Sequence, residues 1–167
     1  ATQALTANQV TSDSFTVQVT DGSATAQASA VFNITGSNDT PTVSAGTQSA
    51  QLVEAGGVGN ADAGTASATV QLTKGDVDGT ATYDASWLTS NGWGTSDSGV
   101  TYTKAGTYGT ATLTVGTNVV SYALTNSASA TQALTANQSA SDSFTVQVTD
   151  GSATAQASAV FNITGSN

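Results

Sequence analysis

Apolar and polar residues alternate along several stretches of the chain. In SFTVQVT, residues 143–149, every second side chain from Phe144 to Val148 is apolar. Asp150-Gly151 follows, and a second alternating stretch then runs to Ile163. A period of two is typical of a half-buried strand, and Asp-Gly between two such stretches is a strong hairpin signal. The pattern therefore predicts a β-hairpin in this part of the chain.

The same periodicity recurs elsewhere. Residues 15–34 repeat the hairpin, and shorter alternating stretches occupy residues 66–72, 113–115 and 120–124. No apolar positions recur with sustained helical spacing, so we expect no helix longer than one turn. Strands separated by turn signals at this spacing are typical of an antiparallel β-sandwich. We therefore expect an all-β fold.

The chain contains a long internal repeat. Residues 1–38 align with residues 130–167 at an offset of 129; of the 38 aligned pairs only Val10/Ser139 and Thr11/Ala140 differ, so 36 match. Such identity is typical of tandem arrays whose copies are kept uniform. We expect residues 1–38 to be the C-terminal part of one repeat, a hairpin plus linker. Residues 39–167 then form one complete 129-residue repeat, which is long enough to bury its own core.

Charge narrows the range of partners. The chain has 11 acidic residues, only Lys74 and Lys104 as basic ones, and a net charge of −9. A polyanion cannot neutralise phosphates, so nucleic acid and anionic membrane surfaces are poor partners, whereas cations are suitable ones. We expect no direct membrane contact, because no apolar run approaches the length needed to cross a bilayer.

An enzymatic function is not expected. Cysteine and histidine are absent, so the usual acyl-transfer arrangements lack a nucleophile and base pair. Asp76 and Asp78 are crowded into one glycine-flanked loop, which suits a cation better than the two facing carboxylates of a glycosidase. An internal lysine–asparagine cross-link would need a buried lysine, and the surroundings of Lys74 and Lys104 do not suggest burial.

The aromatic residues have two possible uses. Trp87 and Trp93 could stack on sugar rings as exposed platforms, or they could fill the core of a sandwich whose inward positions are rich in alanine. We favour the core, because few other large side chains are available. By the same argument we expect Phe32 and Phe161 to be core residues, with the tyrosines Tyr83, Tyr102, Tyr108 and Tyr122.

Five oxygen-bearing side chains are expected to meet at the linker. Asn38 and Asp39 lie on it, and Asp76 and Asp78 follow a strand that should return to the same end. The hairpin turn at Asp150 should reach that end too. Carboxylates and amides at one place are suitable calcium ligands. Asp-Gly and Asn-Asp also occur in solvated turns for backbone reasons alone, and Asp62, Asp84 and Asp97 are assigned to such turns.

Five short motifs, in order, resemble a known family. GTYGTATLTV, SYALTN, ATQALTANQ, DSFTVQVTDG and FNITGSNDTP are similar to motifs of the VCBS repeats of giant bacterial surface adhesins of the RTX type. The resemblance covers nearly all of residues 65–167 and the segment 1–41. It implies an Ig-like or cadherin-like β-sandwich in a tandem, extracellular array on the Gram-negative cell surface, exported by type I secretion and stiffened by calcium. The implied role is cell adhesion and biofilm attachment.

The resemblance to cadherin junctions adds two candidate calcium ligands. Glu54 matches an acidic position that serves the following junction, and Asp13 is a candidate from the preceding repeat. On this basis we expect a structural extender module whose partners are the adjacent repeats. The alternative is a ligand-recognition module that binds glycan through Trp87 and Trp93, or ice through a threonine-rich face such as TATLTV. Residues 1–38 lack the rest of their own repeat, so we also expect self-association through them, either between chains or by exchange with residues 130–167.

Overall fold

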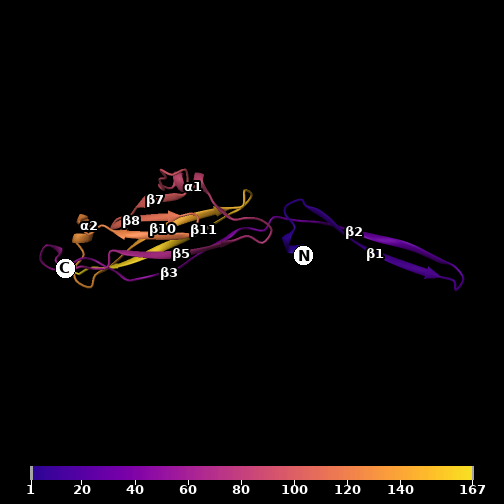
Figure 1. Ribbon diagram of the computed structural model, residues 1–167, viewed down its shortest axis with the longest axis horizontal. Coiled ribbons are helices and arrows are strands. Elements are labelled where there is room, and N and C mark those ends of the chain that lie inside the picture. Colours follow the sequence, from indigo (N-terminus) through magenta and orange to yellow (C-terminus); the bar gives the residue numbers. More distant parts are fainter. Residues whose placement is uncertain (1, 167) are drawn as a thin grey trace.

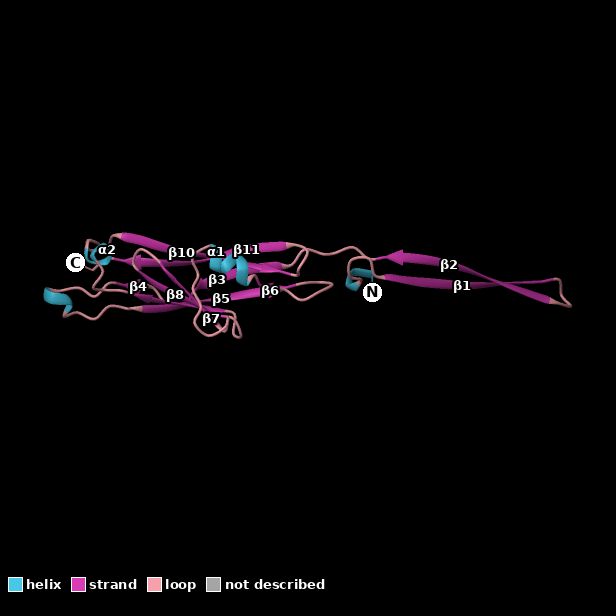
Figure 2. Cartoon of the chain, turned by 90° about the horizontal axis from the view of Figure 1, so that it is seen from above, coloured by secondary structure: helices cyan, strands magenta, loops and turns pink. Residues whose placement is uncertain are grey.

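The computed structural model describes residues 2–166, which form an isolated hairpin followed by a β-sandwich (Figure 1). The hairpin consists of strands β1 (Val10–Thr20) and β2 (Thr25–Thr35), preceded by the short 3-10 helix η1 (Thr2–Ala4). A linker over residues 36–41 leads into the sandwich. The strands of both parts run along the long axis of the molecule, so that the two parts lie end to end (Figure 2). No helix in the described part of the chain is long and apolar enough to span a membrane.

Two sheets make up the sandwich, and its elements follow in chain order. They are β3 (Thr42–Gln48), β4 (Leu52–Val53), η2 (Val58–Asn60), β5 (Ser67–Gly75), β6 (Thr82–Tyr83), α1 (Ala85–Ser90), β7 (Thr101–Ala105), β8 (Gly109–Thr114), β9 (Val119–Leu124), α2 (Ser129–Gln132), β10 (Ser139–Thr149) and β11 (Thr154–Thr164). The first sheet has the order β4-β11-β10-β6 and the second the order β3-β5-β9-β8-β7. In both sheets the paired strands are antiparallel, except for the short parallel pair of β4 with β11 in the first sheet. The expectation of an all-β sandwich is confirmed.

The core lies between the two sheets. Inward residues of β10 and β11 pack against those of β5, β8 and β9. The ring of Phe161 stacks on that of Tyr122 at 4.8 Å between centroids, and Trp93 meets Phe144 edge to face. These aromatic contacts stabilise the core beyond the area that they bury. The expectation that the tyrosines, tryptophans and Phe161 fill the sandwich is confirmed for Trp93, Tyr102, Tyr122 and Phe161, which are buried, while Tyr83, Trp87 and Tyr108 are partly buried against the core.

The expectation for Phe32 is wrong. Its side chain is 59% exposed on β2, whereas its copy Phe161 in β11 is fully buried. The two residues have the same local sequence and the same strand register. The difference arises because β11 is covered by the second sheet of the sandwich and β2 lies outside it.

One helix was not expected from the sequence. Helix α1 extends over Ala85–Ser90, which is more than one turn. The side chain of Asp84 accepts a hydrogen bond from the Trp87 backbone N–H and so caps the helix at its N-terminus. The helix ends at Ser90 with Asn91 as its C-cap, and Gly92 follows with a φ of 85°, a conformation that favours glycine. Asp84 is therefore a helix cap rather than a simple turn residue.

A carboxylate lies inside the sandwich. Asp142 of β10 is only 6% exposed, and its oxygens accept hydrogen bonds from the backbone N–H groups of Thr107 and Tyr108 and from the Tyr122 hydroxyl. These three donors balance the cost of burying the group. Asp142 thereby fixes the turn between β7 and β8 to the opposite sheet.

Candidate metal centre at the linker

The linker is tied to the sandwich by side chains from two loops. The amide nitrogen of Asn38 donates to the Asp150 carboxylate at 2.8 Å. The backbone N–H of Asp39 donates to the Asp78 carboxylate at 3.2 Å. Asp150 belongs to the β10–β11 turn and Asp78 to the loop that follows β5, so the two expected loops reach the same end of the sandwich as the linker.

Asp76 completes the group of five. One of its oxygens accepts a bond of 3.4 Å from the backbone N–H of Asp78. Gly79 lies directly against the other oxygen, since a Cβ atom on Gly79 would stand 3.1 Å from Asp76 Oδ2. The glycine of the DVDG sequence therefore makes room for a carboxylate, a role that the sequence alone does not indicate.

Two carboxylate oxygens in this loop lack a partner. The Oδ2 atoms of Asp76 and Asp78 are buried and receive no hydrogen bond within the described part of the chain. A buried carboxylate oxygen without a donor is costly unless a cation compensates for it. The donor set around these atoms is carboxylate and amide oxygen, which is the chemistry that calcium prefers. The donor chemistry at this end of the sandwich is therefore of the kind that a calcium ion needs.

The five residues are linked in pairs rather than closed around one point. Over residues 2–166, no three acidic side chains come together closely enough to form a metal site as they stand. The linker groups Asn38 and Asp39 use an amide nitrogen and a backbone N–H in the contacts described above. The side-chain oxygens of Asn38 and Asp39 therefore take no part in these two contacts.

Asp150 differs from its copy in the hairpin in one respect. Asp21 and Asp150 each accept two backbone bonds from the turn that follows, which lowers the pKa of both carboxyl groups. For Asp150 the Ala153 N–H is the largest cause, and the Asn38 amide lowers the pKa further.

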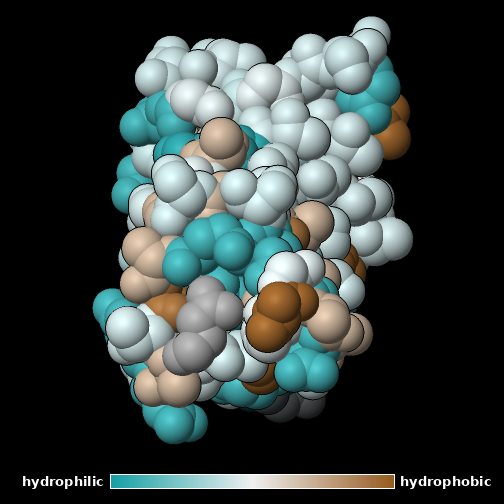
Figure 3. Space-filling model, turned by 90° about the vertical axis from the view of Figure 1, so that its left-hand side faces the viewer, coloured by the Kyte–Doolittle hydropathy of each residue, from teal (hydrophilic) through white to brown (hydrophobic). Residues whose placement is uncertain are grey.

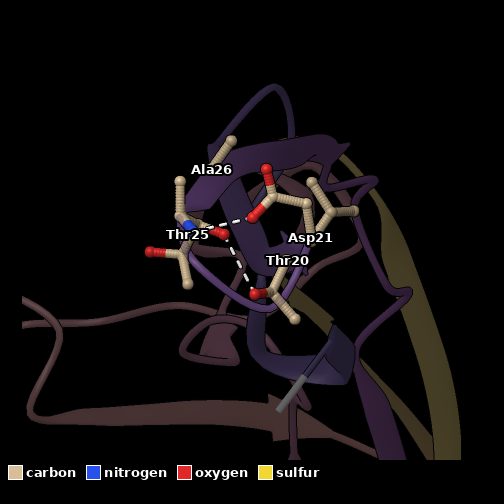
Figure 4. Close-up of a pocket in the computed structure, with 6 residues that line it drawn as sticks. Thr20, Asp21, Thr25 and Ala26 are labelled. Carbon is tan, nitrogen blue, oxygen red and sulfur yellow. Dashed lines mark hydrogen bonds between the residues drawn. The ribbon is translucent and has the colours of Figure 1, made fainter.

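Figure 4 shows the Asp21 turn at the tip of the hairpin, where Val19, Thr20, Asp21, Ala24, Thr25 and Ala26 line a hollow.

Glu54 lies at the opposite end of the sandwich, as expected for a residue that would serve a following junction. Its side chain is fully buried, and it accepts bonds from the Ser166 backbone N–H at 3.2 Å and the Gln132 amide at 3.3 Å. Asp62 exchanges two backbone hydrogen bonds with Gly56 nearby in the fold. This end of the molecule is mainly of intermediate hydropathy, with hydrophilic patches and a few scattered hydrophobic groups (Figure 3).

Asp13 is not part of the linker group. It lies on β1, where it lines a hollow together with Thr2, Leu5, Thr11 and Ile34. Among the described residues no hydrogen bond joins it to Asn38 or Asp39. Its copy, Asp142, has a structural role, because its carboxylate holds a turn of the opposite sheet. The same role accounts for an aspartate at position 13 of the repeated sequence.

The linker glycine has a different role from the one that composition suggests. Gly36 is not a free hinge: its N–H donates to the Gln9 carbonyl, and its own carbonyl accepts from Asn8 N–H. A Cβ atom at Gly36 would collide with the backbone of Thr6 and with Leu5. Glycine is therefore required for close approach. Pro41 at the other end of the linker is buried, so rotation between the two parts is restricted to the few residues around Ser37.

The two tryptophans that a glycan-binding module would use are buried or partly buried, and the threonine-rich face is an ordinary outer sheet face. Trp93 is 2% exposed and its indole N–H donates to the Thr145 carbonyl, so its ring cannot stack on a sugar; Trp87 is partly buried. The threonine-rich stretch TATLTV supplies Thr112, which is in register with Thr103 and Ser121 on the outer face of the second sheet. Hydroxyl groups on the solvent side of an antiparallel sheet are an ordinary feature of such faces.

Both lysines are partly buried, contrary to expectation. The Lys74 ammonium donates to the Ala81 carbonyl and lies 5.7 Å from the centre of the Tyr83 ring. The Lys104 ammonium donates to the Asn91 carbonyl. These contacts attach each lysine to a neighbouring loop. Asp97 lies in a turn as expected, where it accepts bonds from Thr95 and Thr101.

No protein-family model, curated protein or solved structure matches the chain.

Proposed function

We propose that this chain is a structural extender module of a calcium-stiffened extracellular adhesin. The observation that carries the proposal is the attachment of Asn38 and Asp39 to the loops of Asp150 and Asp78, beside two buried carboxylate oxygens that lack a donor. An inter-repeat linker is thereby held to one end of a sandwich by groups that fit a cation. The near-identical repeat at an offset of 129 residues supports an array built from many such units.

Asp76 and Asp78 are the side chains that we expect to bind calcium first. Their unpartnered oxygens belong to one short loop, and both residues are partly buried. Asp39, Asp150 and the Asn38 amide oxygen would supply further ligands from the linker and the neighbouring turn. Calcium would provide the positive charge that these groups lack, since it takes six to eight oxygen ligands.

The mechanical effect follows from which segments are held. Asp39 and Asn38 lie on the linker, and Asp76, Asp78 and Asp150 lie on the sandwich. Without a cation these carboxylates repel one another, and the linker is held by only two hydrogen bonds, one exposed and one partly buried. With calcium bound, both segments would share one ion, and the angle between successive units would become fixed.

An extracellular location is part of the same proposal. A weak site with a dissociation constant of roughly 10⁻⁴ to 10⁻³ M suffices where free calcium is abundant. At a hundredfold excess of calcium over that constant, binding would add about 2.7 kcal/mol to the free energy of unfolding. The module would then gain stability outside the cell and remain less stable where calcium is scarce.

A calcium titration followed by thermal unfolding tests the site. We expect calcium to raise the melting temperature of the 167-residue chain, and chelator to reverse the change. The double variant Asp76→Asn with Asp78→Asn should lose most of this response while retaining the fold. A parent chain whose melting temperature is the same in calcium and in chelator would contradict the calcium site.

Solution scattering on tandem chains tests the extender role separately. Chains with one, two and four copies of residues 39–167 should grow in maximum dimension by a constant step per copy in calcium. Chelator should shorten the longer chains, because the linkers then bend. If the dimension per copy falls with copy number even in calcium, the units are not stiffly joined and the module is not an extender. Near-identical copies favour this role over a recognition tip, which requires only one copy.

A further inference from the structure

The hairpin β1–β2 has an apolar face that the described part of the chain leaves uncovered. Phe15, Val17 and Val19 on β1 are 59%, 60% and 66% exposed. Their copies on β10 are Phe144, Val146 and Val148, and these are at most 1% exposed. The same side chains therefore form the core of the sandwich in one place and a solvent-exposed sheet face in the other.

The two hairpins have the same conformation. Each of the eleven residue pairs of β1–β2 has its counterpart in β10–β11 at the offset of 129. Cross-strand side-chain bonds are also reproduced: Thr16 bonds Ser29 at 2.9 Å, and the copy of this pair is at 2.8 Å. The hairpin β1–β2 thus already has the shape that fits the rest of a sandwich.

Asp13 restricts what can cover the face. It lies among the apolar residues in the position of Asp142, so any partner that buries it must supply hydrogen-bond donors. A second β1–β2 hairpin packed face to face would bury Asp13 against apolar side chains. The surface that covers Asp142 supplies the Thr107 and Tyr108 backbone N–H groups and the Tyr122 hydroxyl. That surface belongs to residues 39–129.

We propose that β1–β2 of one chain docks on a second copy of this chain, where it takes the place of β10–β11 against residues 39–129. Residues 39–129 that follow this hairpin in the same chain cannot receive it. In the β11 position, Thr35 would lie at the far end of an eleven-residue strand, about 36 Å from the end that holds Pro41. The six residues 36–41 reach only about 20 Å when fully extended.

The exchange replaces one hairpin by a nearly identical one. Only Val10 and Thr11 differ from their copies Ser139 and Ala140. Whether a sandwich contains its own β10–β11 or the β1–β2 of a second chain therefore depends on two concentrations. One is the protein concentration, and the other is the effective concentration of the chain's own hairpin, which is of millimolar order for a short connection. Because β10–β11 must first leave the sandwich, exchange accompanies unfolding and refolding at high protein concentration.

A disulfide across the exchanged interface gives a direct test in the full-length chain, which contains no cysteine of its own. In the sandwich, Thr149 of β10 is the partner of Thr82 in β6, and Thr20 is the copy of Thr149. We therefore combine Thr20→Cys with Thr82→Cys. The protein is unfolded in denaturant and refolded at about 1 mM, which is comparable to the effective concentration of the intrachain hairpin, or at about 10 µM, which is far below it. It is then oxidised in a glutathione buffer.

Peptide mapping should find the link between positions 20 and 82 of two chains after refolding at the high concentration, and at least tenfold less at the low one. Thr149→Cys with Thr82→Cys checks that the pair can form a disulfide within one chain. Thr20→Cys with Thr117→Cys places the second cysteine on an exposed turn and measures collisional linking. If the 20–82 link is no more abundant than the 20–117 link, β1 does not occupy the β10 position and the proposal is wrong.

A rescue experiment tests the same exchange without cysteines. Phe144→Ser damages the chain's own hairpin and leaves the intact copy, Phe15, on β1. We expect this variant to fold only as oligomers, with a melting temperature that rises with protein concentration. Adding Phe15→Ser, or Asp13→Ala, should abolish the rescue. Adding Val31→Ser, which changes an exposed residue on the opposite face of the hairpin, should not.

Two results would overturn the proposal. In one, Phe144→Ser is unfolded at every concentration; in the other, Phe144→Ser with Phe15→Ser behaves like Phe144→Ser alone. Phe15→Ser by itself should leave the melting temperature of the sandwich unchanged. The proposal does not rest on the calcium site, so the 20–82 link and the rescue should also be found in chelator.

Discussion

The hydroxyl of Tyr122 donates a hydrogen bond of 2.7 Å to the carboxylate of Asp142 between the two sheets of the sandwich. Burial, and next to it this bond, raises the pKa of the Tyr122 hydroxyl. The bond joins β9 of one sheet to β10 of the other. Asp13, the copy of Asp142, is exposed on an isolated hairpin. One sequence therefore gives the same carboxylate a structural partner in one place and solvent in the other.

Removing the hydroxyl should destabilise the sandwich. Tyr122→Phe leaves Asp142 with its two backbone donors, and the loss of a hydrogen bond to a charged group costs about 1.5–3 kcal/mol. Urea unfolding at neutral pH measures the change in the free energy of unfolding. Asp142→Asn should also be destabilising, whereas Asp13→Asn should have no effect on unfolding of the sandwich. Equal effects of the two aspartate substitutions would contradict the assignment of Asp142.

The parts of the fold that were predictable from the sequence are those that depend on local order. The alternation around Phe144 and the Asp150-Gly151 turn specify a hairpin, and the return of β5 brings Asp78 to the linker. The role of Asp142 depends on a turn some 35 residues earlier in the chain, at Thr107. The position of Asp142 was nevertheless a signal. It lies two residues before Phe144 in the alternating pattern, so its side chain is on the inward face of the strand.

Two further features show why the rest was not predicted. Helix α1 has too few residues to display a helical period, and its N-cap at Asp84 was the available signal. A glycine next to a serine in a linker is typical of a flexible segment, and composition does not distinguish such freedom from the close approach found at Gly36. The structure shows the Thr6 carbonyl and Leu5 in the space that a side chain would need.

Gly106 is expected to tolerate no side chain. A Cβ atom there would collide with the Asp142 carboxylate and the Phe144 ring. Gly106→Ala should therefore destabilise the sandwich by about 1–3 kcal/mol, as overpacking does. Gly116 is the control, since a Cβ atom there meets nothing within 4 Å, and Gly116→Ala should be neutral or stabilising by up to about 1 kcal/mol. Urea unfolding compares the two, and equal stabilities would show that the β7–β8 turn is free to move.

Asp97 should make stability depend on pH in the acid range. Hydrogen bonds from the Thr101 side chain first, and from its backbone, lower the Asp97 pKa to about 2. In the unfolded chain the group titrates near its usual value of about 3.9. A lowered folded-state pKa means that the stabilisation is present above about pH 4 and is lost as the pH falls towards 2.

The side-chain part of this effect can be removed by one substitution. Thr101→Val eliminates the hydroxyl donor while keeping a β-branched residue on β7, so the pKa of Asp97 should rise. Carboxyl NMR titration measures it directly. Thr103→Val on the same strand is the control, because the Thr103 hydroxyl is directed to the Gly94 carbonyl. An Asp97 that titrates at its usual value in the parent chain would show that the Thr101 bonds do not persist in solution.

Asp150 and Asp21 provide a matched pair for the proposed calcium site. Both carboxylates accept the same two backbone bonds from their turns, so an asparagine at either position keeps an acceptor for those bonds. Only Asp150 also accepts the Asn38 amide, at 2.8 Å. The local effect of the substitution on the turn is therefore the same at both positions, and the difference between the variants reports on the linker alone.

If Asp150 is a calcium ligand, Asp150→Asn should weaken calcium binding, because it removes a negative charge from the oxygen set. A loss of about 1.4 kcal/mol corresponds to a tenfold higher dissociation constant. Asp21→Asn should leave the constant unchanged, since the tip of the hairpin points away from the sandwich (Figure 1). Calcium titration followed by thermal unfolding, with scattering on the same samples, compares the two. Equal responses would remove Asp150 from the set, and the linker would then be held by Asp39 and the Asp76–Asp78 loop.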